Sequence, residues 1–277
     1  MSAGSEREHP LPKLPPAGDP RLQEELLALA IDVARRAGAL LLERFDDGRE
    51  RALSSKTSPT DPVSEADLAS ERMIRERLAL ARPADGFLGE EGGGEEGSSG
   101  LTWVVDPLDG TVNFLFGIPQ WCVSVAVRDD HGPLAGAIFD PCRDELFAAT
   151  RGGAPTLNEA PIEASSREEL STAMVATGLA YDAGVRAAQA EVLARVVPRV
   201  RDIRRFGSAA LDLAWTAAGR YDAYFERSVK PWDVEAGTLI CLRAGLTVLD
   251  LPEHENLPPG VLAAVPALAE PLFELVR

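Results

Sequence analysis

The sequence has few cysteines and few histidines for a chain of 277 residues. Its three cysteines, Cys122, Cys142 and Cys241, are widely spaced and form no C-x-x-C pair, so neither a disulfide framework nor a structural zinc site is indicated. The three histidines lie in a proline-rich tail or in polar, turn-like segments, which argues against triads and phosphohistidine chemistry. Any catalysis is therefore expected to use carboxylates and hard cations, which prefer oxygen ligands.

Positive charge is also scarce, because 28 lysines and arginines stand against 44 aspartates and glutamates. The resulting net charge of −16 argues against broad binding of nucleic acid or of an anionic membrane. No apolar run approaches the roughly 18 to 20 residues that span a bilayer, and the N-terminus has neither a basic flank nor an apolar stretch. The sequence therefore predicts a soluble, cytoplasmic protein without a nucleic-acid or membrane partner.

The composition changes once along the chain. Residues 1–18 are rich in proline and have almost no hydrophobic periodicity, which predicts a disordered tail. The remainder, 19–277, has ordinary globular composition and is predicted to form one domain with mixed helix and sheet. We divide it into an N-terminal half over 19–152 and a C-terminal half over 153–277.

The N-terminal half combines helical and extended patterns. Apolar residues that recur every three or four positions predict helices over 19–45 and 64–82. The segment 89–100 is so rich in glycine and acid that an irregular loop is expected, leading into a buried strand at 101–105. Three apolar runs within 121–150, separated by turn residues, predict an antiparallel meander.

The C-terminal half alternates between the two patterns, which favours a helix-and-sheet arrangement. A short helix is expected after Pro266. The other expected elements are helices over 184–201, 208–218 and 233–244, and strands over 221–226, 246–249 and 261–265.

The densest chemical signal is WVVDPLDGTVNF, residues 103–114. Proline in second position favours a four-residue turn over Asp106–Asp109, which brings the first and fourth Cα atoms within roughly 7 Å. Gly110 permits an unusual backbone, and Thr111 and Asn113 could start a helix whose N–H groups face an anion. Two carboxylates beside an anion cradle suggest phosphate chemistry assisted by two Mg²⁺ ions roughly 3.5 to 4 Å apart.

An ordinary turn is the alternative, since Asp-Pro and Asp-Gly are common turn dipeptides. Two further acidic positions favour the metal site. Glu90 and Glu91 follow an apparent strand, and Asp233 stands at the start of a helix. Each of these acids, taken separately, could also be a cap.

Together these segments resemble the inositol monophosphatase family of Mg²⁺-dependent, lithium-sensitive phosphatases. Residues 103–114 are similar to its first signature, PWDVEAGTLICLRAG (231–245) to its second, and GEE (89–91) to the metal-binding element between them. The resemblance covers nearly all of 21–277. It implies a layered αβαβα sandwich of the sugar-phosphatase fold, with the active site between the two halves, and homodimers are common in the family.

The resemblance also implies a set of metal ligands. Glu90, Asp106 and the Leu108 carbonyl would bind the first Mg²⁺. Asp106, Asp109 and Asp233 would bind the second, so that Asp106 bridges the two. A third, weaker Mg²⁺ would be held mainly by Glu90 and water.

The catalytic residues that the resemblance implies are Asp67, Thr111 and Glu90. Thr111 would orient a metal-activated water for direct attack on phosphorus, and Asp67 would help to take up its proton. Lys56 and Asp61, on the polar connection before the second helix, would lie near the third metal. The alternatives are a helix capping box for Asp67, an N-cap for Thr111 and a solvated loop charge for Lys56.

On the leaving-group side, the resemblance implies backbone N–H groups at a helix start and one carboxylate at the end of a strand. That carboxylate, Glu226, could equally be an exposed strand terminus. The residues implied to contact substrate are Asp109, Gly110, Thr111, Gly207, Ser208, Ala209 and Glu226.

The resemblance implies an enzyme that hydrolyses myo-inositol 1-phosphate or a close polyol phosphate with two to three Mg²⁺ ions. Fructose 1,6-bisphosphate, histidinol phosphate and 3′-phosphoadenosine 5′-phosphate are the alternative substrates, of which the residues at 111–114 disfavour the nucleotide. A non-catalytic regulatory binding protein on the same fold is an alternative of another class. Loss of metal ligands would mark it, and here all of them are present.

Overall fold

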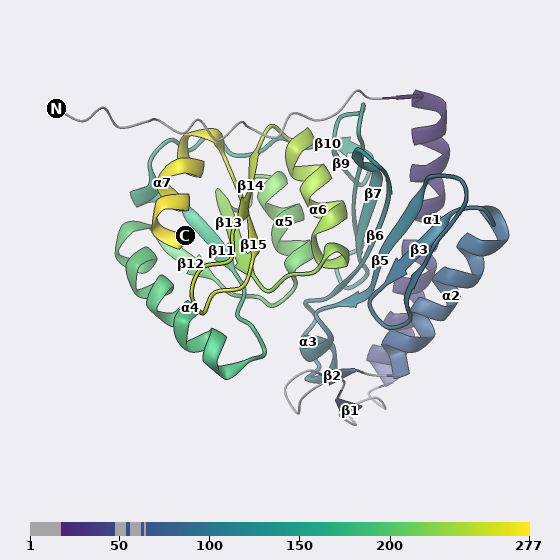
Figure 1. Ribbon diagram of the computed structural model, residues 1–277, viewed down its shortest axis with the longest axis horizontal. Helices are drawn as coiled ribbons and strands as arrows, with labels where there is room; N and C mark the ends of the chain where they lie inside the picture. The colour runs from purple at the N-terminus through teal and green to yellow at the C-terminus, as the bar shows by residue number, and fades with distance from the viewer. Residues whose placement is uncertain (1–17, 48–53, 56–61, 64) are drawn as a thin grey trace.

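The computed structural model describes residues 18–47, 54–55, 62–63 and 65–277 (Figure 1). The predicted tail, apart from Gly18, lies outside the described residues. Lys56 and Asp61 lie outside them too, and so does Ser64, which the capping-box alternative for Asp67 requires.

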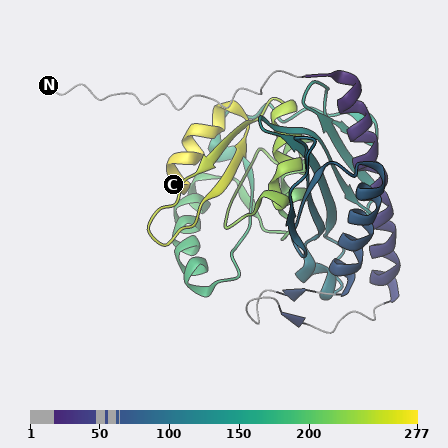
Figure 2. The same ribbon diagram turned by 45° about the vertical axis from the view of Figure 1, so that its right-hand side comes forward.

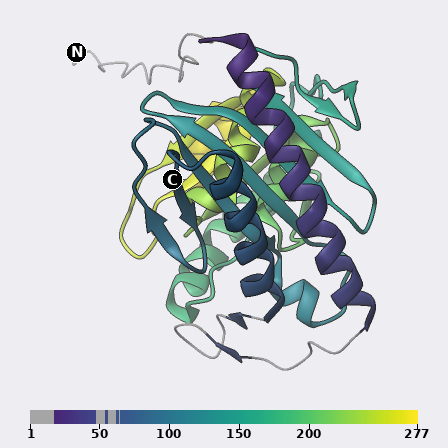
Figure 3. The same cartoon turned by 90° about the vertical axis from the view of Figure 1, so that its right-hand side faces the viewer.

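Two long helices form the first layer and cover one face of the larger sheet (Figure 3). The first, α1 (Pro20–Asp47), extends slightly beyond the predicted end at Phe45. Its buried residues recur every three or four positions, which directs an apolar stripe toward the sheet. The second, α2 (Glu65–Ala81), packs against α1 and against β5 (Thr102–Asp109).

The larger sheet contains eight strands in the order β10-β9-β8-β7-β6-β5-β3-β4. β6, β7 and β8 are antiparallel, which confirms the predicted meander. The prediction of an irregular loop over 89–100 is wrong in part, because β4 folds back along β3. Glycine permits this hairpin, since Gly93 has a φ of +70°. The other strands are β3 (Gly86–Gly89), β4 (Gly93–Glu95), β6 (Cys122–Asp129), β7 (Gly132–Asp140), β8 (Glu145–Thr150), β9 (Thr156–Leu157) and β10 (Ala160–Pro161).

The remaining layers are two helices, a smaller sheet and two more helices (Figures 1 and 2). The smaller sheet has the order β12-β11-β13-β15-β14. Its strands are β11 (Met174–Thr177), β12 (Asp202–Arg204), β13 (Ala223–Arg227), β14 (Thr247–Leu251) and β15 (Gly260–Ala264). The middle helices are α5 (Ala209–Ala217) and α6 (Pro231–Arg243), and the outer ones are α4 (Ala183–Val196) and α7 (Pro266–Val276).

These five layers confirm the predicted αβαβα sandwich. The short elements outside the layers are β1 (Ser54–Ser55), β2 (Pro62–Val63), α3 (Thr111–Leu115) and two 3₁₀ turns, Leu170–Thr172 and Val197–Arg199. Among the described residues, no helix combines the length and the apolar character needed to cross a membrane.

The prediction of a helix over 184–201 is confirmed as far as Val196 and is wrong beyond it. α4 ends at Val196, and the chain continues through the 3₁₀ turn into β12. Pro198 lies within that turn, where its missing N–H and its steric effect on the preceding residue disfavour a continued α-helix.

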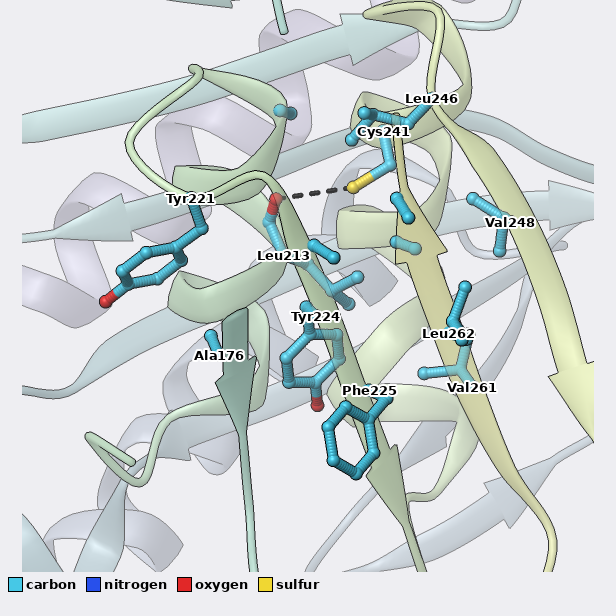
Figure 4. Close-up of a cluster of buried hydrophobic side chains, with 14 of the residues drawn as sticks. Ala176, Leu213, Tyr221, Tyr224, Phe225, Cys241, Leu246, Val248, Val261 and Leu262 are labelled. Carbon is cyan, nitrogen blue, oxygen red and sulfur yellow. Dashed lines mark hydrogen bonds between the residues drawn. The ribbon is translucent and has the colours of Figure 1, made fainter. Parts of the chain in front are cut away.

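The larger sheet is buried on both faces. On β5, Trp103 and Val105 belong to the apolar cluster beneath α1 and α2, whereas Val104 belongs to the cluster shared with α5, α6 and the smaller sheet. Figure 4 shows part of that second cluster, in which the Cys241 thiol donates to the Leu213 carbonyl at 3.3 Å. Because β5 is packed on both sides, the acidic residues at its end have a firmly held backbone.

Candidate active site

The acidic end of β5 is a bulged strand, and the prediction of a four-residue turn there is wrong. Asp106 lies opposite Ser124 of β6 and Asp109 lies opposite Cys122, so β5 has one extra residue between them. Proline explains the bulge, because Pro107 has no N–H to give to the ladder. The Leu108 N–H donates instead to Asp106 Oδ1 at 3.0 Å, which orients that carboxylate.

Gly110 follows the strand and starts α3. Its φ is +98°, and a Cβ at this position would lie 2.8 Å from the Gln120 carbonyl oxygen. Both the backbone conformation and the lack of space therefore require glycine. Figure 1 shows α3 at the end of β5, so the first residue of α3, Thr111, lies next to the strand's carboxylates.

The two residues predicted to activate water are in direct contact. Thr111 Oγ1 lies 2.9 Å from Asp67 Oδ1 and 3.1 Å from the Leu108 carbonyl, so its hydroxyl can donate to either. Both side chains are buried. Asp67 lies in the first turn of α2, which is anchored to β5 because the Ser70 hydroxyl donates to the Pro107 carbonyl at 2.8 Å.

Glu90 lies just after β3, in a segment that is held by a residue the sequence reasoning missed. The buried carboxylate of Glu71 accepts the N–H groups of Glu91 at 2.8 Å and Gly92 at 2.7 Å. Gly89 allows this approach, since a Cβ there would overlap the Glu71 carboxylate. The signal in the sequence is an acid one turn after Asp67 on the same face of α2.

Asp109 is held from the opposite side of the site. Its Oδ2 accepts the Ser208 hydroxyl at 2.6 Å and the Ala210 N–H at 2.8 Å, and both donors belong to the start of α5. Ser208 and Ala210 lower the pKa of Asp109, but burial is the larger effect and raises it to about 6. Ser208, which was predicted to contact substrate, therefore positions a predicted metal ligand in this structure.

Asp233 enters the site from the first turn of α6. That helix begins at Pro231, earlier than predicted, with Lys230 as its N-cap. The Lys230 N–H donates to Asp233 Oδ2 at 2.7 Å, so this carboxylate caps the start of α6, which was the alternative role for it in the sequence analysis. Burial and the charge of Asp109 hold the pKa of Asp233 well above its usual range.

The predicted metal ligands influence one another through their charges. The pKa of Asp106 is held well above its usual range by burial and then by Glu90, Asp109 and Asp233. In the part of the chain that the structure describes, no three His, Cys, Asp or Glu side chains are already gathered around a space for a metal ion. The donor set nevertheless fits Mg²⁺, because it is composed of oxygen and concentrates negative charge that a divalent cation would neutralise. Asp106 and Asp109 are buried, and Glu90 and Asp233 are half-buried.

Glu226 lies at the end of β13 on the leaving-group side. The Tyr224 hydroxyl donates to its Oε2 at 2.9 Å, and burial raises the pKa of Glu226 to about 7. The neighbouring charges that act on it are those of Asp109, which raises its pKa, and of Arg205, which lowers it. Glu226 and Asp109 are therefore close enough for their charges to act on one another.

Asn113 links α3 to the segment before α5. Its side-chain amide donates to the carbonyls of Gln120 at 2.8 Å and Phe206 at 2.7 Å. Gly207 follows with a φ of +84° and leads to Ser208, the N-cap of α5. These contacts place the predicted backbone donors at Gly207 and Ala209 beside α3 and the end of β5.

The described residues thus bring together, from separate elements, the predicted carboxylates and hydroxyls of the site. Glu90 comes from the β3 end, Asp106 and Asp109 from β5, Thr111 from α3 and Asp233 from α6. Lys56 and Asp61 lie outside the described residues, so their predicted place near a third metal stays a prediction.

Comparison with known proteins identifies the same family over most of the chain. The family model described as the inositol monophosphatase family matches residues 22–276. The inositol-1-monophosphatase SuhB of Mycobacterium tuberculosis is 44% identical over 260 residues, which cover 90% of this chain and 89% of that protein. The Nus factor SuhB of Xylella fastidiosa is 42% identical over 230 residues, with 83% of each chain covered.

A solved structure agrees with this assignment. The extragenic suppressor protein suhB from Bartonella henselae superposes with a TM-score of 0.84 at 35% identity, covering 91% of this chain and 98% of that one. The alternation of layers and the arrangement of the two sheets are therefore shared with an experimentally determined fold.

Proposed function

Because this chain belongs to the inositol monophosphatase family, we propose that it hydrolyses myo-inositol 1-phosphate, or a close polyol phosphate, in a Mg²⁺-dependent reaction. It is a phosphoric monoester hydrolase, as its relatives at 44% identity are. The observation that carries the proposal is the set of mutually interacting carboxylates, with Asp106 and Asp109 buried, beside the contact between Thr111 and Asp67.

Five groups would hold the ions: the side chains of Glu90, Asp106, Asp109 and Asp233, and the Leu108 carbonyl. The bulge in β5 supports this set, because it interrupts the pairing with β6 between Asp106 and Asp109, where the Leu108 N–H instead donates to Asp106. The chemistry supplied by bound Mg²⁺ is Lewis acidity toward the phosphoryl oxygens and toward the attacking water.

Thr111 and Asp67 would orient that water and accept its proton. When the Thr111 hydroxyl donates to Asp67, its oxygen is left to accept a hydrogen bond from the water and to aim it at phosphorus. As the water's proton passes to the Thr111 oxygen, the Thr111 hydroxyl proton would pass to Asp67, whose carboxylate takes it up. The burial of both side chains supports this role, since few competing waters reach them.

On the other side of phosphorus, the leaving group would face Glu226 and the start of α5. A carboxylate accepts hydrogen bonds from hydroxyl groups, so Glu226 favours a polyol over an apolar leaving group. Asp109 would serve both this subsite and the ions, and its Oδ2 is oriented by the Ser208 hydroxyl.

A second candidate function is a regulatory binding protein on the same fold. It is motivated by a relative that is named a Nus factor. The complete acidic set favours catalysis for this chain, because a purely regulatory role would not require buried carboxylates that raise one another's pKa.

The test is phosphate release from inositol 1-phosphate, fructose 1,6-bisphosphate, histidinol phosphate and 3′-phosphoadenosine 5′-phosphate, each with Mg²⁺, with EDTA and with Li⁺. We expect Mg²⁺-dependent preference for the inositol ester, with loss of turnover in EDTA and inhibition by Li⁺. Preference for another ester would change the substrate. Absence of turnover on all four would favour the regulatory role.

A further inference from the structure

The carboxylate of Glu226 is packed directly against a glycine of the neighbouring strand. β11 and β13 are parallel, with Thr177 opposite Phe225, so Gly178 lies beside Glu226. A Cβ built on Gly178 would overlap the carboxylate carbon and both oxygens of Glu226. The φ of Gly178 is outside the left-handed region, so this position requires glycine for space and not for backbone conformation.

A hydrogen bond holds the same carboxylate from its own strand. Tyr224 stands two residues before Glu226, on the same face of β13. Its side chain is fully buried, and its hydroxyl donates to Glu226 Oε2 at 2.9 Å. Burial keeps the pKa of Tyr224 well above its usual range, so the phenol remains a donor at neutral pH.

A buried acid on α5 lies near Tyr224 and Glu226. Asp212 is completely buried, and in the described part of the chain neither of its carboxylate oxygens has a hydrogen-bond partner. Burial holds the pKa of Asp212 well above its usual range, and the charge of Glu226 raises it further. The Glu226 carboxylate is therefore fixed by Gly178 against both oxygens and by the Tyr224 hydroxyl on Oε2, with a buried acid nearby.

We propose that Gly178 and Tyr224 orient the Glu226 carboxylate, and that this orientation selects leaving groups that carry hydroxyls over those that carry none. The inference rests on the proposed function and adds two positioning residues to it. With Oε2 occupied by Tyr224, Oε1 is the oxygen that accepts from the substrate. A leaving group without hydroxyls would shield Oε1 from water without donating a hydrogen bond to it, which weakens binding.

The experiment compares two substrates in two variants. Gly178→Ala displaces the carboxylate, and Tyr224→Phe removes only its hydrogen bond. For each variant, kcat/KM is measured with inositol 1-phosphate and with phenyl phosphate, whose leaving group has no alcohol hydroxyl. The control is Gly94→Ala on β4, where a Cβ would make only ordinary contacts, 3.6 Å from Leu88 Cδ1 and 3.7 Å from the Phe87 carbonyl.

We expect the ratio of kcat/KM for the inositol ester to that for phenyl phosphate to fall about tenfold in Gly178→Ala and roughly fivefold in Tyr224→Phe. The change should appear mainly in KM for the inositol ester, with an unaltered Mg²⁺ requirement. Gly94→Ala should keep the wild-type ratio.

An unchanged ratio in both variants, or an equal loss on both substrates, would overturn the inference. If Gly178→Ala does not fold, Tyr224→Phe still tests the inference, because it removes a single oxygen atom and leaves the packing of the ring in place. A wild-type protein that hydrolyses phenyl phosphate but no polyol ester would refute the proposed substrate. The wild-type measurements therefore distinguish failure of the proposed substrate from failure of the role proposed for Gly178 and Tyr224.

Discussion

The buried carboxylate of Glu71 offers a direct test of how the acidic site is held. Its two oxygens accept the N–H groups of Glu91 at 2.8 Å and Gly92 at 2.7 Å, next to the proposed ligand Glu90. Glu71→Gln keeps the shape of the side chain but replaces one acceptor with a donor. At least one charge-assisted hydrogen bond is lost, and a buried donor then faces another donor, which costs about 1.5 to 3 kcal/mol.

The cost of Glu71→Gln should appear either in the Mg²⁺ requirement or in the free energy of unfolding. If the segment of Glu90 becomes disordered without metal, Mg²⁺ binding has to order it again. The Mg²⁺ concentration for half-maximal activity would then rise by up to roughly 10- to 150-fold. If the segment stays ordered, the cost lowers the free energy of unfolding instead. In both cases kcat at saturating Mg²⁺ should stay near the wild-type value, because Glu71 is not placed to touch the substrate.

The assay is Mg²⁺ titration of phosphate release together with urea unfolding of the metal-free protein. The matched control is Glu76→Gln, an exposed acid on the same helix, which should change neither quantity. If Glu71→Gln left both the Mg²⁺ requirement and the unfolding free energy unchanged, the structural role assigned to this carboxylate would be wrong.

Three further predictions concern the site itself. Thr111→Val should lower kcat by about 100-fold or more at saturating Mg²⁺, whereas Thr111→Ser should retain most activity, because the hydroxyl that contacts Asp67 is the group required. Asp109→Asn should sharply reduce turnover while circular dichroism still reports a folded chain; unchanged hydrolysis would refute its role as a ligand. The pKa of Glu226 is raised from 4.5 to about 7 in the folded state, so its ionised form is destabilising and wild-type stability is lost as pH rises through that interval. Glu226→Gln cannot ionise, so its free energy of unfolding relative to that of wild type should be higher at pH 8 than at pH 5, measured by urea unfolding without metal. An equal difference at both pH values would contradict this.

Much of the first layer and of the meander follows from local patterns. The apolar periodicity of α1 and the alternation of turn residues with apolar runs in β6, β7 and β8 are properties of short windows, and each window has one favourable way to bury its apolar side. The predicted site residues rest on the resemblance of short motifs, such as residues 103–114 and 231–245, to the inositol monophosphatase family.

Local patterns failed where a contact from elsewhere in the chain decides the conformation. The pattern at Asp106–Asp109 favours a turn in isolation, but pairing with β6 keeps it extended and places the irregularity at Pro107 as a bulge. Glycines over 89–100 predict a loop, and alignment with β3 converts part of it into β4. In both cases hydrogen bonds to a neighbouring strand outweigh a local preference of about 1 kcal/mol.

The sequence by itself determined which groups are available for chemistry: an all-oxygen set of acids, and a hydroxyl in the same motif as two of them. Only the tertiary structure decided how these groups are oriented. Glu71 supports the segment of Glu90, Ser208 holds Asp109, and Gly178 leaves room for Glu226. These contacts join residues from different helices, strands or loops, and no short window of sequence contains both partners, so packing of the complete fold creates them.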